Sequence, residues 1–584
     1  MLRLLCAAWI ICRVAAYEYI LRSADFEHYI KEFGLNDFEP PSHKSPDIPN
    51  SKAWDYLRDN MPLIDVPDKD LERTYYFRLW TYRKHIKLVT VYPTIPLLID
   101  KEKRLTMEQK TVGVNFQIVT EFLNHVDWEG YGGSISCAAA HHFREGRWLH
   151  DTKFLESYAK FWFTDNAGQP RQYSFWAADS IKAFADVTGD KEMLLSMLPA
   201  LIKNYETYMK TNFNAKKGLW FNVDNRDGME ASISGRGGNF RCYRPTLNSY
   251  QFGDAQAIHD IASGYSHLGA VADKYRAIAE DLRNRVNLEL YDRNASFYKV
   301  LPKESERNPL EQQNLSDVRE LHGYTPWYFS LPPGGDGRGE AWRQLMDRQG
   351  FFSAYGPTTA EHRHKGFTVE YSKKHECQWN GPVWPYATSI TLTALANYLN
   401  DDKYKEENSR NRYVSKEDYF TLLKLYALSQ RRRLEAVNKT VDWIDENIDP
   451  SSGVWLSRAM LREWRDGTWA QSKGGEERGK DYNHSTFIDL LLSGLFGIRP
   501  SSKDELIVNP LVSEKMWHHF CVDNIQYHKR VITLLYDKDG SFYNRGSGFK
   551  VFVDGALAAS SRGLERLTID LSVNGQMNRR ATNE

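Results

Sequence analysis

Cysteine is scarce in this sequence. The chain of 584 residues has six cysteines, and no two of them stand in Cys-x-x-Cys spacing. Two lie within the first 16 residues, and the others are far apart, at Cys137, Cys242, Cys377 and Cys521. Small disulfide-built domains and structural zinc sites need closely spaced cysteines. The sequence therefore favours neither class, and we expect no metal and no cofactor.

The chain also has no net charge at pH 7. Lys and Arg together number 76, as do Asp and Glu, and only residues 431–433 form a run of three basic residues. Proteins that bind nucleic acid rely on clustered positive charge to neutralise phosphates. The charge balance therefore argues against a nucleic-acid partner.

Long apolar runs are absent, and the chain has one short apolar run at its start. Arg3 precedes an apolar stretch at residues 4–12, and small residues follow at 14–16. This order is typical of a secretory signal, and the stretch is too short to span a bilayer. We expect a signal peptide at residues 1–16, a secreted or secretory-pathway protein, and no membrane span in the mature chain. A buried N-terminal helix, which would leave the protein in the cytoplasm, is the alternative interpretation.

Hydrophobic periodicity divides the rest of the chain into three parts. Residues 17–113 mix proline and charged residues with short amphipathic stretches, which predicts an irregular lead-in with an insertion near 86–112. From 114 to 500, apolar residues recur at helical spacing between long loops rich in glycine, asparagine and tryptophan. This pattern predicts a mainly α-helical toroid with its site on the face that carries the loops. From 501 to 584, extended apolar runs and the Asp-Gly pair at 539–540 predict a small β-rich C-terminal domain.

Two segments combine an acid with glycine, aromatic and hydrogen-bonding residues. The first contains Asp227, Met229 and Glu230, and the second begins at Glu463 and ends at Trp469. Cleavage of a glycosidic bond needs one protonated carboxyl group for the leaving oxygen and one carboxylate that activates water or attacks the sugar. We therefore predict that the two segments supply this pair and that the ligand is a carbohydrate.

Other segments place planar hydrogen-bonding groups beside aromatic rings, as hydroxyl-rich ligands require. Flat aromatic faces stack on sugar rings, and arginine forms bidentate hydrogen bonds. The chain is rich in such rings, with 17 Trp and 33 Tyr. Residues in loops and at helix starts are well placed to face a ligand. The candidate substrate-binding residues are Trp176, Asp179, Arg244, Asn248, His322, Trp327, Gln378, Trp379, Asn380, Trp384, Tyr482 and His484.

The order of these motifs resembles that of trehalase-like and glycoside hydrolase family 63-like enzymes, which include mannosylglycerate hydrolases. Trp176-Ala-Ala-Asp comes first, followed by Gly228-Met-Glu and by Gln378-Trp-Asn-Gly-Pro-Val-Trp. A late acid ahead of an aromatic helix start completes the order. The resemblance covers residues from about 115 to 500. It implies an (α/α)6 barrel and hydrolysis with inversion of the anomeric carbon, and we expect an exo-acting enzyme.

The resemblance also implies roles for the acids. Trehalases carry a Gly-Trp-Asp motif whose Asp is the general acid, and Glu230 stands at that position, with Asp227 as its competitor. Family 63 enzymes place the general base in a late Glu-x-x-x-x-x-Thr-Gly-like segment. Glu463 fits this placement loosely, without the family's Pro and Gly. Glu476 and Glu477, which lie nearer the aromatic helix start, are alternative bases.

Two other functions are compatible with the same pattern. Helical toroids also host sugar epimerases and isomerases, which move protons with paired histidines, and a catalytically inactive homologue would bind carbohydrate without cleaving it. Release of reducing sugar from a glycoside separates hydrolysis from both alternatives. Because function depends on the site rather than the fold, the sequence leaves the sugar and the linkage open.

Overall fold

The computed structural model describes residues 19–37, 46–92, 113–235, 240–303, 314–370, 375–463 and 473–572. The predicted signal peptide lies outside the described residues. Within them, no helix reaches the length and apolarity that crossing a membrane requires.

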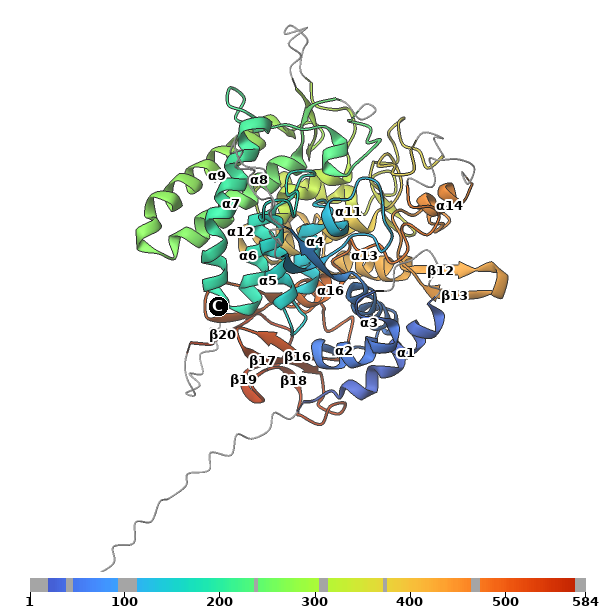
Figure 1. Cartoon of the computed structure of the whole chain (residues 1–584). Helices are drawn as coiled ribbons and strands as arrows, with labels where there is room; N and C mark the ends of the chain where they lie inside the picture. Colours follow the sequence, from blue (N-terminus) through green and yellow to red (C-terminus); the bar gives the residue numbers. More distant parts are fainter. Residues whose placement is uncertain are drawn as a thin grey trace, which may run out of the picture.

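The helices of the main domain close into a ring, which confirms the predicted mainly α-helical toroid (Figure 1). Helix α3 packs on α16, and contacts then follow from α16 to α4, α6, α8, α10, α11 and α13, and from α13 back to α3. The bounds of these helices are α3 Lys69–Lys84, α4 Ala139–Gly146, α6 Ala177–Thr188, α8 Pro245–Ser263, α10 Thr325–Tyr328, α11 Pro385–Asn400, α13 Lys416–Ser429 and α16 Phe487–Asp489. Leu490–Leu495 continues α16 as a π-helix.

Burial distinguishes the ring from the helices around it. Almost every side chain of α3, α8 and α11 is buried, whereas α7 and α9 bury one face only. A helix that is apolar on one side covers a core, and one that is buried all round lies inside it. The covering and remaining helices are α5 Lys153–Trp162, α7 Lys191–Asn212, α9 Gly269–Glu289, α12 Asp402–Asn411 and α14 Leu456–Glu463.

The N-terminal region is not irregular as predicted, because it contains three helices. Helices α1 Glu27–Asn36 and α2 Ala53–Asn60 precede α3, and α3 belongs to the ring. The ring therefore begins near residue 69 rather than 114. Helix α3 escaped prediction because it is buried on nearly all sides and its buried residues mix aromatic rings with charged side chains such as Arg78 and Arg83, so no hydrophobic period marks it.

The predicted insertion near 86–112 begins with regular structure. Strand β2, Ile86–Val91, pairs antiparallel with β3, Val114–Val119, in a continuous register from Ile86 opposite Val119 to Val91 opposite Val114. Residues 93–112 lie outside the described part of the chain.

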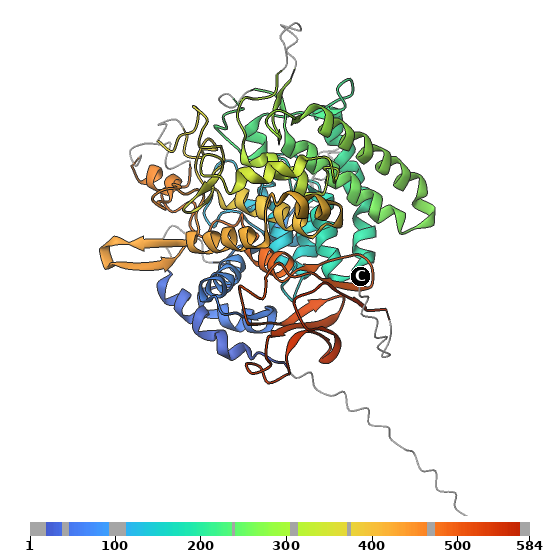
Figure 2. The same cartoon turned by 180° about the vertical axis from the view of Figure 1, so that it is seen from behind.

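The C-terminal region is β-rich, as its extended runs predict. Its main sheet has the order β1-β16-β17-β18-β19, and β1 comes from the N-terminal region, Leu63–Asp65. The first residues of the described chain also join this region, because Asp523 accepts the backbone N–H of Ile20 and of Leu21 at 2.6 and 2.9 Å. Figures 1 and 2 show α1 and α2 beside this sheet. The strands are β15 Glu505–Val508, β16 His519–Tyr527, β17 Arg530–Asp537, β18 Gly548–Val553, β19 Ala556–Ser561 and β20 Leu567–Asp570.

Short antiparallel strand pairs lie in the loops between the helices. One of them, β12–β13, extends away from the body in both views (Figures 1 and 2). Their bounds are β4 Phe213–Asn214, β5 Leu219–Trp220, β6 Cys242–Tyr243, β7 Tyr291–Asp292, β8 Phe297–Tyr298, β9 Leu301–Pro302, β10 Phe352–Ser353, β11 Gly356–Pro357, β12 Arg431–Leu434 and β13 Lys439–Asp442. Strand β14, Ile498–Arg499, joins the ring to the C-terminal region by pairing with β15.

Candidate active site

A tight turn separates the two acids of the first predicted segment. Gly228 has φ +68°, the left-handed region, and a Cβ atom there would overlap the Sγ atom of Cys137. Only glycine fits both conditions without strain. The turn sends Asp227 into the interior and leaves Glu230 beside the loop that carries Trp379, whose backbone N–H donates to the Glu230 carbonyl at 3.1 Å.

Asp227 is fully engaged inside the protein. Its oxygens accept Arg244 Nε at 2.7 Å, Asn222 Nδ2 at 2.7 Å and Ser174 Oγ at 2.6 Å, together with the Thr246 hydroxyl. The side chains of Asp227 and Arg244 both have an exposed fraction of 0%. An Arg-bound carboxylate with this many donors holds structure together, so Asp227 is poorly suited to give a proton to a substrate.

Glu230 has the opposite environment. It is half-buried, and among the described residues no side chain donates a hydrogen bond to its carboxyl group. Burial raises the pKa of Glu230 to about 8, and the negative charges of Asp224 and Glu376 act in the same direction. The next residue, Ala231, has φ +57°, a strained conformation that proteins retain mainly at functional sites. Glu230 is therefore protonated at neutral pH and accessible.

Glu446, a carboxylate that the sequence analysis missed, contacts the loop that carries Trp379. Cys377, two residues before Trp379, donates its thiol hydrogen to Glu446 Oε2 at 3.6 Å. Arg478 binds both oxygens of Glu446, with Nε to Oε1 at 2.6 Å and Nη2 to Oε2 at 2.7 Å. The loop thus contacts the Glu230 backbone through Trp379 and the Glu446 side chain through Cys377. Burial, together with the charges of both acids, raises the pKa of the Cys377 thiol, so both acids lie near this loop.

The sequence around Glu446 held a signal that could have identified it. Glu446-Asn-Ile-Asp-Pro-Ser-Ser-Gly has five residues between the acid and a Ser-Gly pair, and it contains a proline. This is the Glu-x-x-x-x-x-Thr-Gly-like spacing with serine in place of threonine. Glu463 lacks the proline and the glycine, and it was predicted for its late position with Thr468, ahead of the aromatic helix start.

The predicted base and its alternatives lie elsewhere. Glu463 ends α14 with an exposed side chain. Glu476 pairs with Arg462 at 2.7 Å, and Glu477 pairs with Arg458. The structure thus pairs Glu476 with the exposed Arg462 and Glu477 with the buried Arg458, and no contact in the described chain links Glu463 to the loop that contacts Glu230 and Glu446.

Two further acids surround the pair. Burial would raise the pKa of Glu376, but the charges of Arg478 and Lys473 outweigh this and hold it at about 2. Arg478 Nη1 donates to Glu376 Oε1 at 2.6 Å. Glu121 is buried, which raises its pKa to about 8, and it accepts the Tyr482 hydroxyl. Arg478 therefore joins two carboxylates, while Glu121 is a second protonated acid that is already hydrogen-bonded.

Aromatic rings line this part of the molecule. Trp379 stacks on Trp384 with ring centroids 4.6 Å apart, and the Trp384 Nε1 donates to the carbonyl of Gln378 at 2.7 Å. Tyr482 lies 3.5 Å from His484 by ring centroids. The structure therefore gathers Gln378, Trp379, Trp384, Tyr482 and His484 near the acid pair, as the sequence analysis expects of a sugar site.

Other predicted substrate-binding residues serve the interior. The Asn248 side chain accepts Trp220 N at 2.9 Å and donates to the Trp220 and Arg244 carbonyls. Trp327 packs among Tyr298 and Trp342 with an exposed fraction of 0%. Asn248 and Trp327 therefore contact the protein interior and do not face a substrate pocket as predicted.

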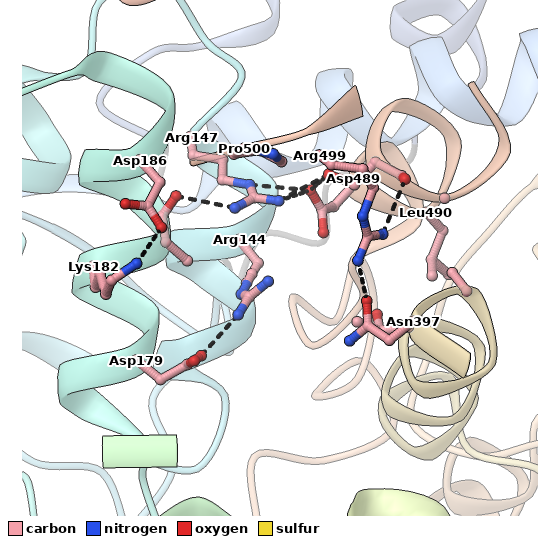
Figure 3. A pocket seen from close by; sticks show the side chains of 15 residues that line it. Arg144, Arg147, Asp179, Lys182, Asp186, Asn397, Asp489, Leu490, Arg499 and Pro500 are labelled. Atoms are coloured by element: carbon pink, nitrogen blue, oxygen red, sulfur yellow. Dashed lines mark hydrogen bonds and ion pairs between the residues drawn. The ribbon is translucent and has the colours of Figure 1, made fainter. Parts of the chain in front are cut away.

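The remaining predicted residues lie next to the acid site or beyond it. His322 bonds with Glu320 at 3.0 Å and approaches Arg244 to 3.5 Å, and the buried Asn380 Oδ1 has no partner among the described residues. Trp176 stacks on Tyr250 at 4.2 Å inside the ring. Asp179 faces a separate cavity, where it accepts Arg144 Nη2 at 2.7 Å (Figure 3).

One group of side chains in the described chain has donor atoms close enough for a metal ion. Ligand atoms of His375, Glu376 and Cys377 lie within 4.8 Å of one another. A cation there would have to compete with Arg478 and Lys473, which already pair with Glu376. The donor set therefore fits an ion pair better than a metal site.

Comparison with known proteins agrees with this chemistry. The chain resembles the model of the "Mannosylglycerate hydrolase MGH1-like glycoside hydrolase domain" over residues 131–485. It belongs to the MGH1-like glycoside hydrolase family.

Solved structures resemble the chain to different degrees. One titled "Sialidase" matches 95% of this chain at 34% identity with a TM-score of 0.79, and this chain covers 45% of that longer one. A GH63 mannosylglycerate hydrolase from Thermus thermophilus, in complex with glucose, matches 56% of this chain and 76% of its own at 14% identity and a TM-score of 0.38. An α-L-rhamnosidase from Aspergillus terreus matches 88% of this chain and 50% of its own at 11% identity and a TM-score of 0.48.

Proposed function

We propose that this glycosidase inverts the anomeric carbon, with Glu230 as general acid and Glu446 as general base. The observation that carries the proposal is the contrast between the two carboxyl groups on either side of the loop containing Cys377 and Trp379. One has its pKa raised to about 8 and no side-chain partner in the described chain, and the other is bound at both oxygens by Arg478. A protonated carboxyl group and a carboxylate held by an arginine are the acid and the base that hydrolysis with inversion requires.

Glu230 supplies the proton for the leaving oxygen. A carboxyl group kept protonated at neutral pH by burial is the usual general acid of glycosidases. Glu121 has a similar pKa, but its carboxyl accepts the Tyr482 hydroxyl and is only 3% exposed. Accessibility therefore favours Glu230 as the proton donor.

Glu446 activates the attacking water. A carboxylate has about four lone-pair positions, so the two bonds from Arg478 and the one from Cys377 leave room for a water molecule. Inverting enzymes hold the two carboxyl groups roughly 6.5–9.5 Å apart to accommodate that water. Glu463 is the competing base, and substitution of each residue decides between them.

We propose an oligosaccharide or small glycoside as substrate, cleaved from its end. The titles of the solved structures name a sialidase, a mannosylglycerate hydrolase and a rhamnosidase, and these names set the first substrates to test here. A panel of aryl glycosides, disaccharides, mannosylglycerate and sialosides, followed by NMR of the first-formed anomer, identifies the sugar and the stereochemistry. An inverted anomer supports the proposal. A retained anomer would show that the second carboxylate acts as a nucleophile and not as a general base.

A carbohydrate-binding homologue without activity and a sugar epimerase are the alternatives. Reducing sugar released from any glycoside of the panel, and lost in Glu230→Gln, excludes both. We also propose that the protein enters the secretory pathway through residues 1–16, which N-terminal sequencing of the protein exported from its own cells tests.

A further inference from the structure

A second cavity lies inside the ring, away from the acid pair. It encloses about 180 Å³ and is lined by α4, α6, α11 and the segment from Asp489 to Pro500 (Figure 3). Helix α4 runs from the acid site to the cavity. Its start follows Cys137, which touches the Gly228 turn, and its end carries Arg144 and is followed by Arg147, which line the cavity.

A layer of aromatic side chains separates the cavity from the acid site. His141 lies between Tyr386 and Trp176, with ring centroids 4.5 and 5.6 Å away, and Trp176 stacks on Tyr250. All of these rings are buried. The eight residues of α4, between Cys137 and Arg147, rise roughly 12 Å. The cavity is therefore not a subsite of the acid pair.

Basic side chains outnumber acidic ones in the cavity wall. Arg144, Arg147, Lys182 and Arg499 face it, together with three aspartates. Each aspartate already has a cationic partner. The ion pairs are Arg144 with Asp179, Arg147 with Asp489 and Lys182 with Asp186, each at 2.7 Å.

Arg499 is the cation that remains. Its guanidinium donates to the Asn397 Oδ1 at 2.6 Å and to the Ser493 carbonyl at 3.5 Å, and no carboxylate of the described chain forms an ion pair with it. Burial lowers the pKa of Arg499 to about 10, which still leaves it charged at neutral pH. A desolvated charge without a counter-ion is costly.

Two other polar atoms in the wall lack partners. The Nε of Arg144 and the Oδ1 of Asp186 are buried and have no hydrogen-bond partner among the described residues. In Figure 3, Arg144 lies between the Lys182 side of the cavity and the Arg499 side. Neither atom is accessible from the cavity, whose wall therefore carries three ion pairs and one positive charge in excess, that of Arg499.

We propose that this cavity binds a small anion, with the guanidinium groups of Arg499 and Arg144 holding the anionic group. Hydrogen phosphate has this chemistry, and so does a sugar acid such as glucuronate. Both present oxygens that accept hydrogen bonds from guanidinium groups. The cavity volume of about 180 Å³ limits the ligand to this size.

Isothermal titration of the full chain with sodium phosphate, with glucuronate and with neutral glucose, at constant ionic strength, tests the proposal. We expect phosphate or glucuronate to bind and glucose not to bind. Arg499→Gln should weaken that binding at least about tenfold, as expected for loss of a charge-assisted hydrogen bond. The control is Arg410→Gln, which changes an arginine with a 69% exposed side chain paired only with Glu406 on α12.

A second variant and a second titration make the result specific. Arg499→Lys keeps the charge and should retain binding if Arg499→Gln loses it. Glu230→Gln should bind the anion as the unmodified protein does, because the aromatic layer separates the two places. Absence of binding by both anions, or equal binding by Arg499→Gln, overturns the proposal. An anion lost in Glu230→Gln also overturns it, because that ligand would occupy the acid site.

Discussion

Arg478 binds both oxygens of Glu446, with Nε to Oε1 at 2.6 Å and Nη2 to Oε2 at 2.7 Å. Its third nitrogen, Nη1, donates to Glu376 at 2.6 Å, so a single guanidinium holds two acids of the site. Such bidentate geometry fixes orientation as well as charge. It keeps Glu446 in place beside the loop that also contacts Glu230.

The base can be identified by substitution of Glu446. Glu446→Ala should lower kcat by roughly 10²- to 10⁴-fold on both activated and unactivated glycosides, because leaving-group assistance does not replace a missing base. Added azide should restore part of the rate and give a glycosyl azide. Steady-state kinetics with aryl glycosides of varied leaving group provide the measurement.

Glu463→Ala and Glu476→Ala are the matched controls for the base. Both side chains lie toward the surface, and we expect near-normal turnover from each variant. If Glu463→Ala is inactive and Glu446→Gln is active with a native thermal transition, the base is Glu463. If all three positions tolerate substitution, the paired-carboxylate mechanism fails.

The acid can be identified by leaving-group dependence. Glu230→Gln should reduce turnover of unactivated glycosides by about 10²- to 10⁴-fold and that of activated aryl glycosides by much less, since a good leaving group needs no proton. Near-normal hydrolysis of a disaccharide by this variant would rule out Glu230 as the donor. Glu121→Gln is the comparison, since Glu121 is the other acid whose pKa burial raises to about 8.

The pKa of Glu230 predicts the pH dependence. A general acid must be protonated, so kcat/KM should fall as pH rises through about 8. The same shift affects stability. A carboxyl group whose pKa is raised in the folded state contributes stability that is complete below its unfolded value and is lost as pH rises through about 8. Thermal melts of Glu230→Gln should therefore lose less Tm than the unmodified protein between pH 5 and pH 9.

The sequence indicated the proposed acid more directly than the proposed base. Glu230 lies in a short segment whose glycine, methionine and acid stand together, so its local motif was enough to single it out. The environment of Glu446 comes from partners distant in the chain, because Arg478 and Cys377 lie on separate loops. The proline and the Ser-Gly spacing after Glu446 are visible in the sequence, but they do not reveal whether the side chain is buried. Burial is what distinguishes Glu446 from the exposed Glu463.

Fold prediction had a similar limit. The helices after residue 190 were predicted because α7 and α9 have one apolar face, and the C-terminal strands because their runs are β-branched. Helix α3 is buried on nearly all sides and buries charged as well as aromatic side chains, so periodicity could not reveal it. Asn248 and Trp327 were misplaced for a related reason, since sequence does not distinguish a polar or aromatic side chain facing a ligand from one that satisfies the interior.

Cys377 should position the base. Its thiol donates to Glu446 Oε2 at 3.6 Å, and burial raises the thiol pKa well above its usual range, so it acts as a neutral donor. Cys377→Ala should lower kcat by about tenfold, the usual worth of one hydrogen bond, and shift the lower-pH limb of the kcat profile. Cys377→Ser keeps a donor and should restore most of the rate. A uniform rate loss in both variants with an unchanged pH profile would indicate packing alone.

Asp227 should be required for stability rather than for proton transfer. Asp227 and Arg244 form a pair with no exposed side-chain surface, and removing one partner of such a pair costs about 3–5 kcal/mol because the other charge remains buried. Asp227→Asn should therefore lower Tm markedly, and the folded fraction at low temperature should keep the leaving-group dependence and pH profile of the unmodified enzyme. Arg244→Met, which removes the other charge, should give a similar loss of Tm. A stable Asp227→Asn variant that is inactive only on unactivated glycosides would instead make Asp227 the general acid.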